Sequence, residues 1–284
     1  MRVEDLDGPR AVPGAAQAIA EDLRFLGLDW DEGWGFGADG PLAGREVGAH
    51  GPYTQGQRGA RYEDALLRLQ AQGLVFPCSC TRRELALAQS SAPHGQLGPL
   101  YPGTCLAGPT HPERQQALRF RMPFRSEPFV DEIQGPTDLN VRDDFVVRRS
   151  DGLFAYQLAV VVDDIAMGVN HVVRGADLLS STPRQLALYR ALGADPPRFA
   201  HVPLVLNRAG QRLAKRDGAV AIADYREAGC SAEQLVGALG ASLGLCSPGE
   251  KIGPAGLLGN FAPERIGHSP TYWDPQALGL PELG

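Results

Sequence analysis

The centre of the chain alternates apolar helical segments with short apolar strands, and this pattern constrains the fold most strongly. "AYQLAVVVDDIAMG" (155–168) has the length and apolar content of a helix, and "HVVRG" (171–175) reads as a short strand. "SSTPRQLALYRALG" (180–193) has a proline in its first turn and a final glycine, which predicts a helix with Thr182 as its N-cap. "HVPLVLN" (201–207) is a second strand. Strands that alternate with helices favour a parallel sheet, so we predict an α/β protein.

The flanking regions are less regular. Residues 14–28 predict one helix, and a second helix is expected to end at Gly73. The glycine-rich stretch 29–44 between them has no periodicity and is predicted to be a loop. Residues 117–150 have a β-like pattern, which we interpret as a small inserted sheet, and the chain is expected to turn helical after residue 222.

Three of the five cysteines, Cys78, Cys80 and Cys105, are clustered in the sequence. The odd total argues against a disulfide scaffold. Thr81 and Glu84 form a capping-box pattern, so a helix is expected to start just after the first two cysteines. Three converging thiolates make a tetrahedral zinc site that lacks one ligand. The alternative is that they are three small buried residues.

The fourth zinc ligand is open at this point. Histidine is the ordinary partner, which makes His94 and His111 the candidates that chemistry favours. Tyr101, four residues before Cys105, is a less common type of ligand. We expect Cys230 and Cys246 to be packing residues of the C-terminal helices.

Polar residues at the ends of the central strands suggest a ligand site. Tyr156 and Arg174 lie where open α/β sheets bind ligands, and an arginine there can hold a carboxylate through two parallel hydrogen bonds. "RLAKRDGA" follows "HVPLVLN" and contains Lys215, so it suits a polyphosphate. The competing interpretations are a structural arginine and a solvated basic turn.

The composition and net charge exclude some classes of function. The net charge of −6 gives no overall positive surface for nonspecific nucleic-acid binding. Hydrophobic residues make up 43% and charged residues 21%, as in an ordinary globular protein, and no apolar run reaches membrane-spanning length. We therefore expect a soluble, cytoplasmic protein. No Ser-His-Asp arrangement and no common glycine-rich phosphate motif stands out.

Taken together, the motifs resemble the catalytic half of glutamyl-tRNA synthetases, a class I family, from residue 2 to about residue 225. Those motifs are "RVEDLD", "FLGLDWDEG", "GPYTQGQR", "CSCTRREL", "YPGTC", "DDFVVRRSDG", "YQLAVVVDDIAMGVNHVVRG" and "RLAKRDGA", in this order. The "CxC…YxxxC" pattern and the lack of an anticodon-binding domain are similar to the short members, the glutamyl-Q tRNA(Asp) synthetases. The resemblance implies a class I aminoacyl-tRNA synthetase fold with a Rossmann-like catalytic domain. The implied organisation is a first catalytic part (1–75), a zinc-binding insertion (76–151), a second catalytic part with a KMSKS-like loop (152–222) and a helical C-terminal region (223–284).

The resemblance also implies an activity. Such enzymes activate L-glutamate with ATP, expected to act with Mg²⁺, and attach it to the queuosine base of tRNA(Asp). A monomer with one Zn²⁺ per chain is expected. Two alternatives stay open: a truncated discriminating glutamyl-tRNA synthetase core, and a catalytically silent protein that binds zinc or RNA.

Residue roles follow from the matching motifs. The resemblance implies that Glu4 holds the glutamate amino group and that Tyr156 and Arg174 contact the same substrate. Lys215 matches the second lysine of KMSKS and is expected to neutralise ATP phosphates. The implied zinc ligands are Cys78, Cys80, Tyr101 and Cys105, so the family favours tyrosine over histidine. Asp163 and Asp164 lie in a matching stretch, and no role is assigned to them.

The N-terminus departs from the family pattern. In that family "RVEDLD" follows a strand and helix that carry the HIGH signature, whereas here it begins at residue 2. We expect an upstream segment on the order of 30 residues, about one strand-plus-helix unit. We also expect the chain as written to be inactive without it.

Overall fold

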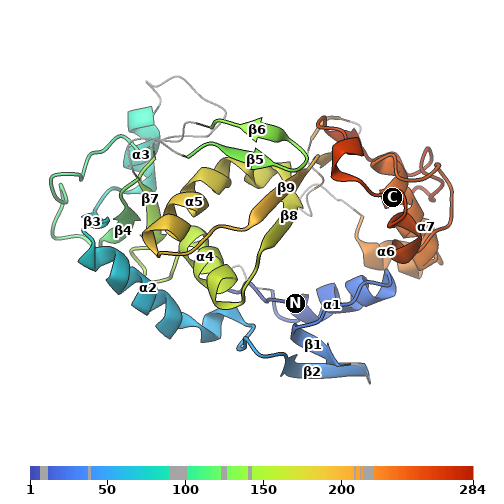
Figure 1. Cartoon of the computed structure of the whole chain (residues 1–284), viewed down its shortest axis with the longest axis horizontal. Coiled ribbons are helices and arrows are strands. Elements are labelled where there is room, and N and C mark those ends of the chain that lie inside the picture. The colour runs from blue at the N-terminus through green and yellow to red at the C-terminus, as the bar shows by residue number, and fades with distance from the viewer. Residues whose placement is uncertain are drawn as a thin grey trace.

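The computed structural model describes residues 1–6, 12–37, 40–89, 101–122, 127–139, 143–207, 209–211, 213 and 220–283 (Figure 1). The helices are α1 (Ala15–Phe25), α2 (Gly59–Ala71), α3 (Arg82–Gln89), α4 (Tyr156–Ala166), α5 (Thr182–Ala191), α6 (Ile222–Glu227), α7 (Ala232–Ser242) and α8 (Pro254–Leu257). Short 3₁₀ helices are η2 (Gln55–Gln57), η3 (Ala176–Ser181) and η5 (Pro263–Arg265). The strands are β1 (Gly33–Gly37), β2 (Gly40–Val47), β3 (Val75–Cys78), β4 (Ala117–Phe120), β5 (Phe129–Asp131), β6 (Gly135–Thr137), β7 (Phe145–Arg148), β8 (His171–Gly175), β9 (Arg198–Val202), β10 (Val205–Leu206) and β11 (Thr271–Tyr272).

A four-stranded sheet in the order β6-β5-β9-β8 lies at the centre of the molecule (Figure 1). β8 and β9 are parallel and are joined through η3 and α5, so the predicted parallel unit is confirmed. β9 also pairs in parallel with β5, and β5 pairs with β6 in antiparallel fashion. The strand expected over 201–207 is divided into β9 and β10. The break contains Pro203, which has no N–H to donate to a sheet.

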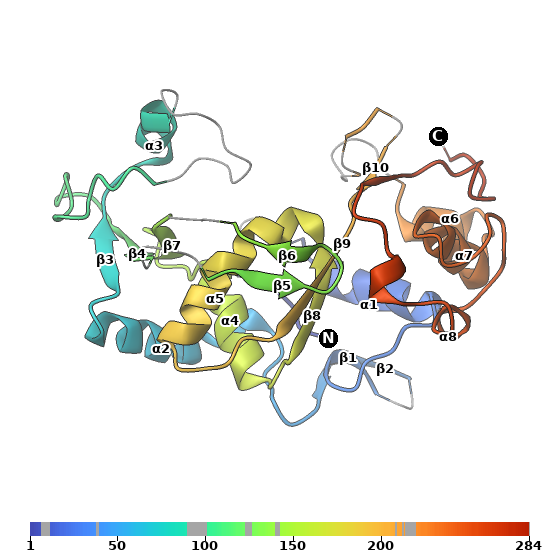
Figure 2. The same cartoon turned by 45° about the horizontal axis from the view of Figure 1, so that its top comes forward.

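The residues predicted to form one inserted sheet contribute to two sheets. β4 and β7 join β3 in an antiparallel three-stranded sheet, next to which α3 projects at one end of the molecule (Figure 2). β5 instead pairs with β9, and Asp131 lies opposite Phe199 in this pair. The single-sheet prediction was therefore wrong. A local β pattern identifies a strand but not its partner, which here lies far along the chain.

The glycine-rich stretch 29–44 forms most of a β-hairpin instead of the predicted loop. β1 and β2 pair in antiparallel fashion with a register shift between Trp34 and Phe36. Gly33 has a φ of 134° and packs against the Met1 backbone, where a Cβ atom would overlap Met1. The glycines leave no side-chain periodicity from which these strands could be predicted, because backbone pairing and close packing stabilise them.

The main core lies between the three-stranded sheet and helices α2, α4 and α5. Its buried residues include Tyr62, Leu66 and Leu69, which share one face of α2. Leu158 and Val161 of α4 complete the contact. The amphipathic face of α2 therefore packs as its sequence period requires.

A second core joins α1 to the C-terminal region, where α6 and α7 lie on the same side of the molecule as α1 (Figure 1). Leu26 packs with buried residues that include Tyr225 and Leu235, and Cys230 belongs to the same core. After α8 the described chain continues as η5, β11 and irregular segments, and β11 pairs in parallel with β10.

The capping predictions have mixed outcomes. At the start of α7 the Ser231 side chain accepts a hydrogen bond from the backbone N–H of Gln234, which forms a capping box. Glu84 and Thr81 exchange the same kind of bonds before α3. The prediction for Thr182 was wrong, because α5 continues directly from η3 and Ser181 is at the N-cap position. The Thr182 hydroxyl instead accepts a hydrogen bond from Arg174.

Candidate active site

The N-terminal residues are fixed beside η2 through backbone pairing. Val3 donates its N–H to the Tyr53 carbonyl at 2.8 Å, and its carbonyl accepts from the Gln55 N–H at 2.9 Å. The Asp5 carboxylate accepts the Gly56 N–H at 2.7 Å. These bonds hold the segment in register with η2. They bring the charged residues of "RVEDLD" to α4.

Asp163 and Asp164, to which the sequence assigned no role, point to different partners. Asp163 is fully buried and accepts from Arg58 Nε at 2.5 Å, Gln55 Nε2 at 2.8 Å and Tyr62 Oη at 2.9 Å. Arg58 is fully buried as well. Asp163 therefore ties α4 to η2 and α2, and its role is structural.

Asp164 instead holds Arg2 at the site. Arg2 Nη1 donates to Asp164 Oδ1 at 2.6 Å, and Tyr189 Oη donates to Asp164 Oδ2 at 3.2 Å. Burial raises the pKa of Asp164, and the bonds from Arg2 and Tyr189 only partly oppose that rise. Arg2 also donates from Nη2 to Glu4 Oε1 at 3.0 Å. The arginine thus bridges a buried carboxylate and the exposed Glu4, a role that sequence reasoning missed although Arg2 belongs to the quoted motif.

The three residues expected to bind glutamate lie close together, although they come from different segments. Tyr156 is the first residue of α4, Arg174 lies on β8, and Glu4 lies in the N-terminal segment. The pKa of Tyr156 is raised, first by burial and then by the negative charge of Glu4. Arg174 acts on the same hydroxyl in the opposite direction. We call Arg2, Glu4, Tyr156, Asp164 and Arg174 the Arg174 cluster.

Arg174 is anchored by polar residues that sequence reasoning also missed. Its Nε donates to His201 Nε2 at 3.0 Å, and its Nη2 donates to Thr182 Oγ1 at 2.9 Å and to the Leu178 carbonyl at 3.5 Å. His201 in turn contacts Asp131, with Nδ1 2.5 Å from Oδ2. Burial lowers the pKa of Arg174. In the sequence, the only signal for His201 and Asp131 is that each is a polar residue in a mostly apolar strand.

The Arg174 cluster combines both signs of charge with a phenol. A carboxylate at Glu4 can accept from an ammonium group, while a guanidinium can hold a carboxylate. Such a pairing suits a small zwitterion.

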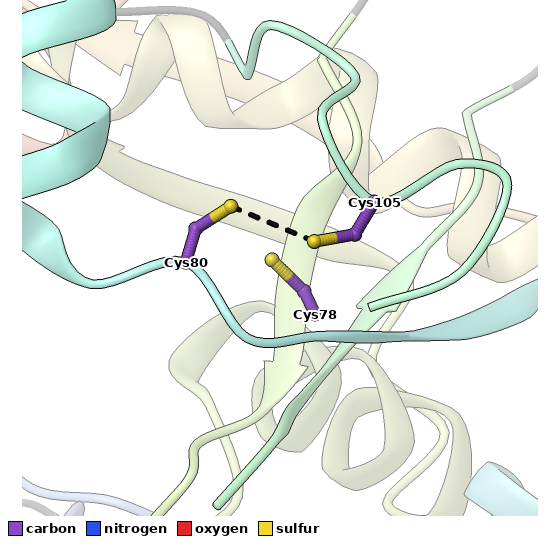
Figure 3. A group of neighbouring side chains, drawn as sticks. All are labelled: Cys78, Cys80 and Cys105. Carbon is purple, nitrogen blue, oxygen red and sulfur yellow. Dashed lines mark hydrogen bonds between the residues drawn. The ribbon is translucent and has the colours of Figure 1, made fainter. Parts of the chain in front are cut away.

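The three predicted thiols converge at the end of the three-stranded sheet (Figure 3). Cys78 ends β3, Cys80 follows it, and Cys105 comes from a separate loop; their Sγ atoms all lie within 4.8 Å of one another. The Sγ atoms of Cys80 and Cys105 are 3.6 Å apart. Two sulfurs bound to a tetrahedral zinc would be separated by about 3.8 Å, given Zn–S bonds of about 2.3 Å. The donor set and its spacing therefore fit zinc.

Of the candidate fourth ligands, Tyr101 lies at the thiols. Its Oη is 3.6 Å from Cys78 Sγ and accepts the Cys105 N–H at 2.7 Å. The imidazole of His111 is partly exposed, and its Nδ1 lies 3.4 Å from a Glu113 carboxylate oxygen. His94 lies outside the described residues. This arrangement favours the tyrosine that the family resemblance implied over His111.

The thiols differ in acidity. Burial raises the pKa of Cys105, but hydrogen bonds outweigh this effect and lower it to about 6. Burial and the neighbouring thiols raise the pKa of Cys80 to about 12. A cation shared by the cluster would be needed to hold all three as thiolates.

The predicted ATP-binding residue Lys215 lies outside the described residues, as do Arg212 and Ala214 of the same loop. The chain enters this loop from β10 through a turn in which Asn207 Oδ1 accepts the N–H of Ala209 at 3.0 Å and of Gln211 at 2.9 Å. The role of Lys215 stays a prediction.

Among the described helices, none has the length and apolar character needed to cross a membrane.

Residues 1–251 match the family of class I tRNA synthetases (E and Q), catalytic domain. A glutamyl-Q tRNA(Asp) synthetase of Symbiobacterium thermophilum is 48% identical over 95% of this chain and 84% of its own length. Glutamate–tRNA ligase 1 of Halorhodospira halophila is 36% identical over 98% of this chain but only 58% of its own length. The crystal structure of a glutamate tRNA ligase from Elizabethkingia meningosepticum, in complex with its amino acid, superimposes with a TM-score of 0.75 at 25% identity. That superposition covers 98% of this chain and 60% of the solved one.

These similarities confirm the class I catalytic-domain fold, with a Rossmann-like arrangement of mixed α/β sheets. They extend through the three-stranded and four-stranded sheets and through the segments that carry the Arg174 cluster. The chain therefore belongs to the family of class I tRNA synthetases for glutamate and glutamine, a family of ligases, in which it is similar to members named glutamyl-Q tRNA(Asp) synthetase.

Proposed function

We propose that this protein activates glutamate with ATP and transfers it to the queuosine base of tRNA(Asp). The observation that carries the proposal is the meeting of Glu4, Tyr156 and Arg174 from three separate segments. The names of the relatives support the acceptor, and the higher identity and more complete coverage of the glutamyl-Q relative favour it over glutamate–tRNA ligase.

The cluster supports a division of roles. The Glu4 carboxylate accepts hydrogen bonds from the glutamate ammonium group, and Arg174 holds a carboxylate of the substrate with Tyr156 beside it. A carboxylate oxygen of the substrate that Arg174 does not hold then attacks the α-phosphate of ATP, and pyrophosphate is released. This step needs alignment and charge neutralisation more than a protein nucleophile. Lys215 is proposed to neutralise phosphate charge, with Mg²⁺ bound to the nucleotide.

An acceptor assay tests the proposal. The protein as its gene encodes it is supplied with labelled glutamate and ATP, together with tRNA(Asp) with or without queuosine or with tRNA(Glu). We expect label only in queuosine-containing tRNA(Asp). Label in tRNA(Glu) would instead identify a glutamyl-tRNA synthetase core, and label in no tRNA, together with no glutamate-dependent pyrophosphate exchange, would identify a silent binding protein.

We also propose that Cys78, Cys80, Cys105 and Tyr101 bind one structural zinc ion. The thiol spacing and the buried position of Cys78 and Cys105 support it. The ion would cross-link β3 to the loop that holds Tyr101. Arg184 and the Tyr101 backbone share the Asp143 carboxylate, which joins this loop to α5. The ion thus supports the body of the protein without taking part in the reaction.

Cys105→Ser should abolish stoichiometric zinc binding. A structural zinc site contributes about 10–16 kcal/mol to folding of its module, so this loop should become sensitive to protease. Zinc per chain is measured by mass spectrometry, and the expected wild-type value is about one. The matched control is Cys246→Ser, whose thiol lies near the Gly237 carbonyl and away from the cluster. Wild-type protein that holds no zinc and has three freely titratable thiols would refute the assignment.

A further inference from the structure

We infer that His201 and Asp131 are positioning residues that orient Arg174 for carboxylate binding, and that they make glutamate affinity depend on pH. The inference rests on the proposed function of the Arg174 cluster. Neither residue contacts the substrate in this account. They act through the guanidinium.

The three residues lie on three adjacent strands of the central sheet. Arg174 of β8 lies directly opposite His201 of β9, and Asp131 comes from β5 on the other side of β9. His201 and Asp131 are both almost completely buried. A buried histidine and aspartate in such a row need each other as partners, because an unpaired polar group in this position would be costly.

The hydrogen bonds define the tautomer of His201. A guanidinium is only a donor, so His201 Nε2 must accept the bond from Arg174 Nε and carries no proton. The ring proton therefore lies on Nδ1, which donates to Asp131 Oδ2 at 2.5 Å. Asp131 is itself fixed, because its Oδ1 accepts the backbone N–H groups of Ile133, Gln134 and His201.

His201 and Thr182 contact only one edge of the Arg174 guanidinium. Nε and one Nη2 hydrogen form one edge of the guanidinium, and His201 and Thr182 occupy that edge. The edge formed by Nη1 and Nη2 can hold a carboxylate in two parallel bonds when the substrate replaces the long 3.5 Å contact of Nη2 with the Leu178 carbonyl. Arg174 also lies over the Phe199 ring, 5.2 Å from its centroid, which limits rotation of the planar group.

Protonation of His201 would break this geometry. A second ring proton would place an N–H donor and a positive charge against the Arg174 donor. The charged groups that face His201 are Asp131 from β5, Arg174 from β8 and Asp177 from η3. Burial lowers the pKa of His201 below 6.5, and the Arg174 charge adds to that effect against the attraction of Asp131. The neutral, competent form is therefore present at neutral pH and is lost as the pH falls through this lowered pKa.

Asp131→Asn tests the tautomer. The asparagine oxygen can keep the backbone bonds, but its amide NH₂ would donate to His201 Nδ1 and force the ring proton onto Nε2, facing Arg174. Loss of a hydrogen bond to a charged group predicts a rise of about 10–100-fold in KM for glutamate. The KM for ATP should stay near the wild-type value. Both constants are measured by ATP–pyrophosphate exchange.

His201→Gln tests the titration. Its side-chain oxygen can replace Nε2 as the acceptor, and the amide does not ionise. The wild-type KM for glutamate should rise as the pH is lowered from about 8 to about 5.5, whereas the KM of His201→Gln should stay nearly constant. The matched control is His171→Gln on β8, whose imidazole pairs with Glu132 and is partly exposed. This control should keep the wild-type profile.

The outcomes separate this inference from the proposed function. In one outcome, Arg174→Ala weakens glutamate binding, Asp131→Asn leaves the KM for glutamate unchanged and His201→Gln follows the wild-type pH profile. This outcome would refute the positioning role of His201 and Asp131 and leave the proposed binding site intact. If Arg174→Ala has no effect on glutamate, the proposed site itself is wrong. An equal loss of glutamate and ATP affinity in Asp131→Asn would also refute a positioning role.

Discussion

Replacing Arg174 by alanine should lower kcat/KM for glutamate by about 10²–10³-fold, the largest expected effect on activity in the described site. Truncating one partner of a buried, hydrogen-bonded charge pair typically costs about 2–5 kcal/mol. The substrate carboxylate would lose its two parallel bonds, and the anchoring groups at His201 and Thr182 would lose their partner. The measurement is glutamate-dependent ATP–pyrophosphate exchange with the protein as its gene encodes it.

Two comparisons sharpen this experiment. Arg174→Lys keeps a positive charge but lacks the planar fork, so it should recover only part of the activity. Arg198→Ala removes an exposed arginine from β9, where it pairs with Glu132, and should leave the exchange rate nearly unchanged. If Arg174→Ala and Arg198→Ala behave alike, Arg174 has no role in binding.

Replacing Asp163 by alanine should destabilise the protein by about 3–5 kcal/mol, the largest expected effect on stability. Removing one partner of a buried ion pair leaves the other charge uncompensated, and here Arg58 would be left without its carboxylate. Arg58 Nη2 already lacks a hydrogen-bond partner among the described atoms, so little local compensation is available. Gln55 and Tyr62 would lose their acceptor as well.

Urea unfolding measures this effect through the midpoint at a constant m-value. The control is Glu127→Ala, which breaks the ion pair with Arg190 in which both side chains are half exposed. Surface pairs of this kind contribute about 0–1 kcal/mol. A change in Asp163→Ala no larger than that of the control would show that the buried network does not stabilise the contact between α2 and α4.

Helix α2 buries one regular face, whereas α4 was predicted from its apolar content, because residues 158–164 are all buried. α2 and α4 pack through the apolar residues that marked them, and β8 and β9 pair as their alternation with helices required. Periodicity failed at the β1–β2 hairpin, whose glycines carry no side-chain pattern. It also failed for β5, because the choice of β9 as its partner is made by tertiary packing.

The residues of the candidate site also differ in whether the sequence could predict them. The thiol cluster followed from spacing, and Tyr156 and Arg174 followed from their position in the α/β pattern. Glu4 and the roles of these residues followed from the family resemblance. Arg2, Asp131 and His201 could not be found from sequence alone, since each acts through a partner that is distant along the chain. A lone polar residue in an apolar strand gives no indication of which neighbour it will meet.

The central claim, that the protein attaches glutamate to a base and not to the terminal ribose, is tested most directly by removing the ribose. Queuosine-containing tRNA(Asp) lacking its 3′-terminal adenosine is incubated with labelled glutamate and ATP. We predict the same label incorporation as with intact queuosine-containing tRNA(Asp). Loss of all incorporation upon removal of the adenosine would contradict the account, because it would place glutamate on the 3′ end.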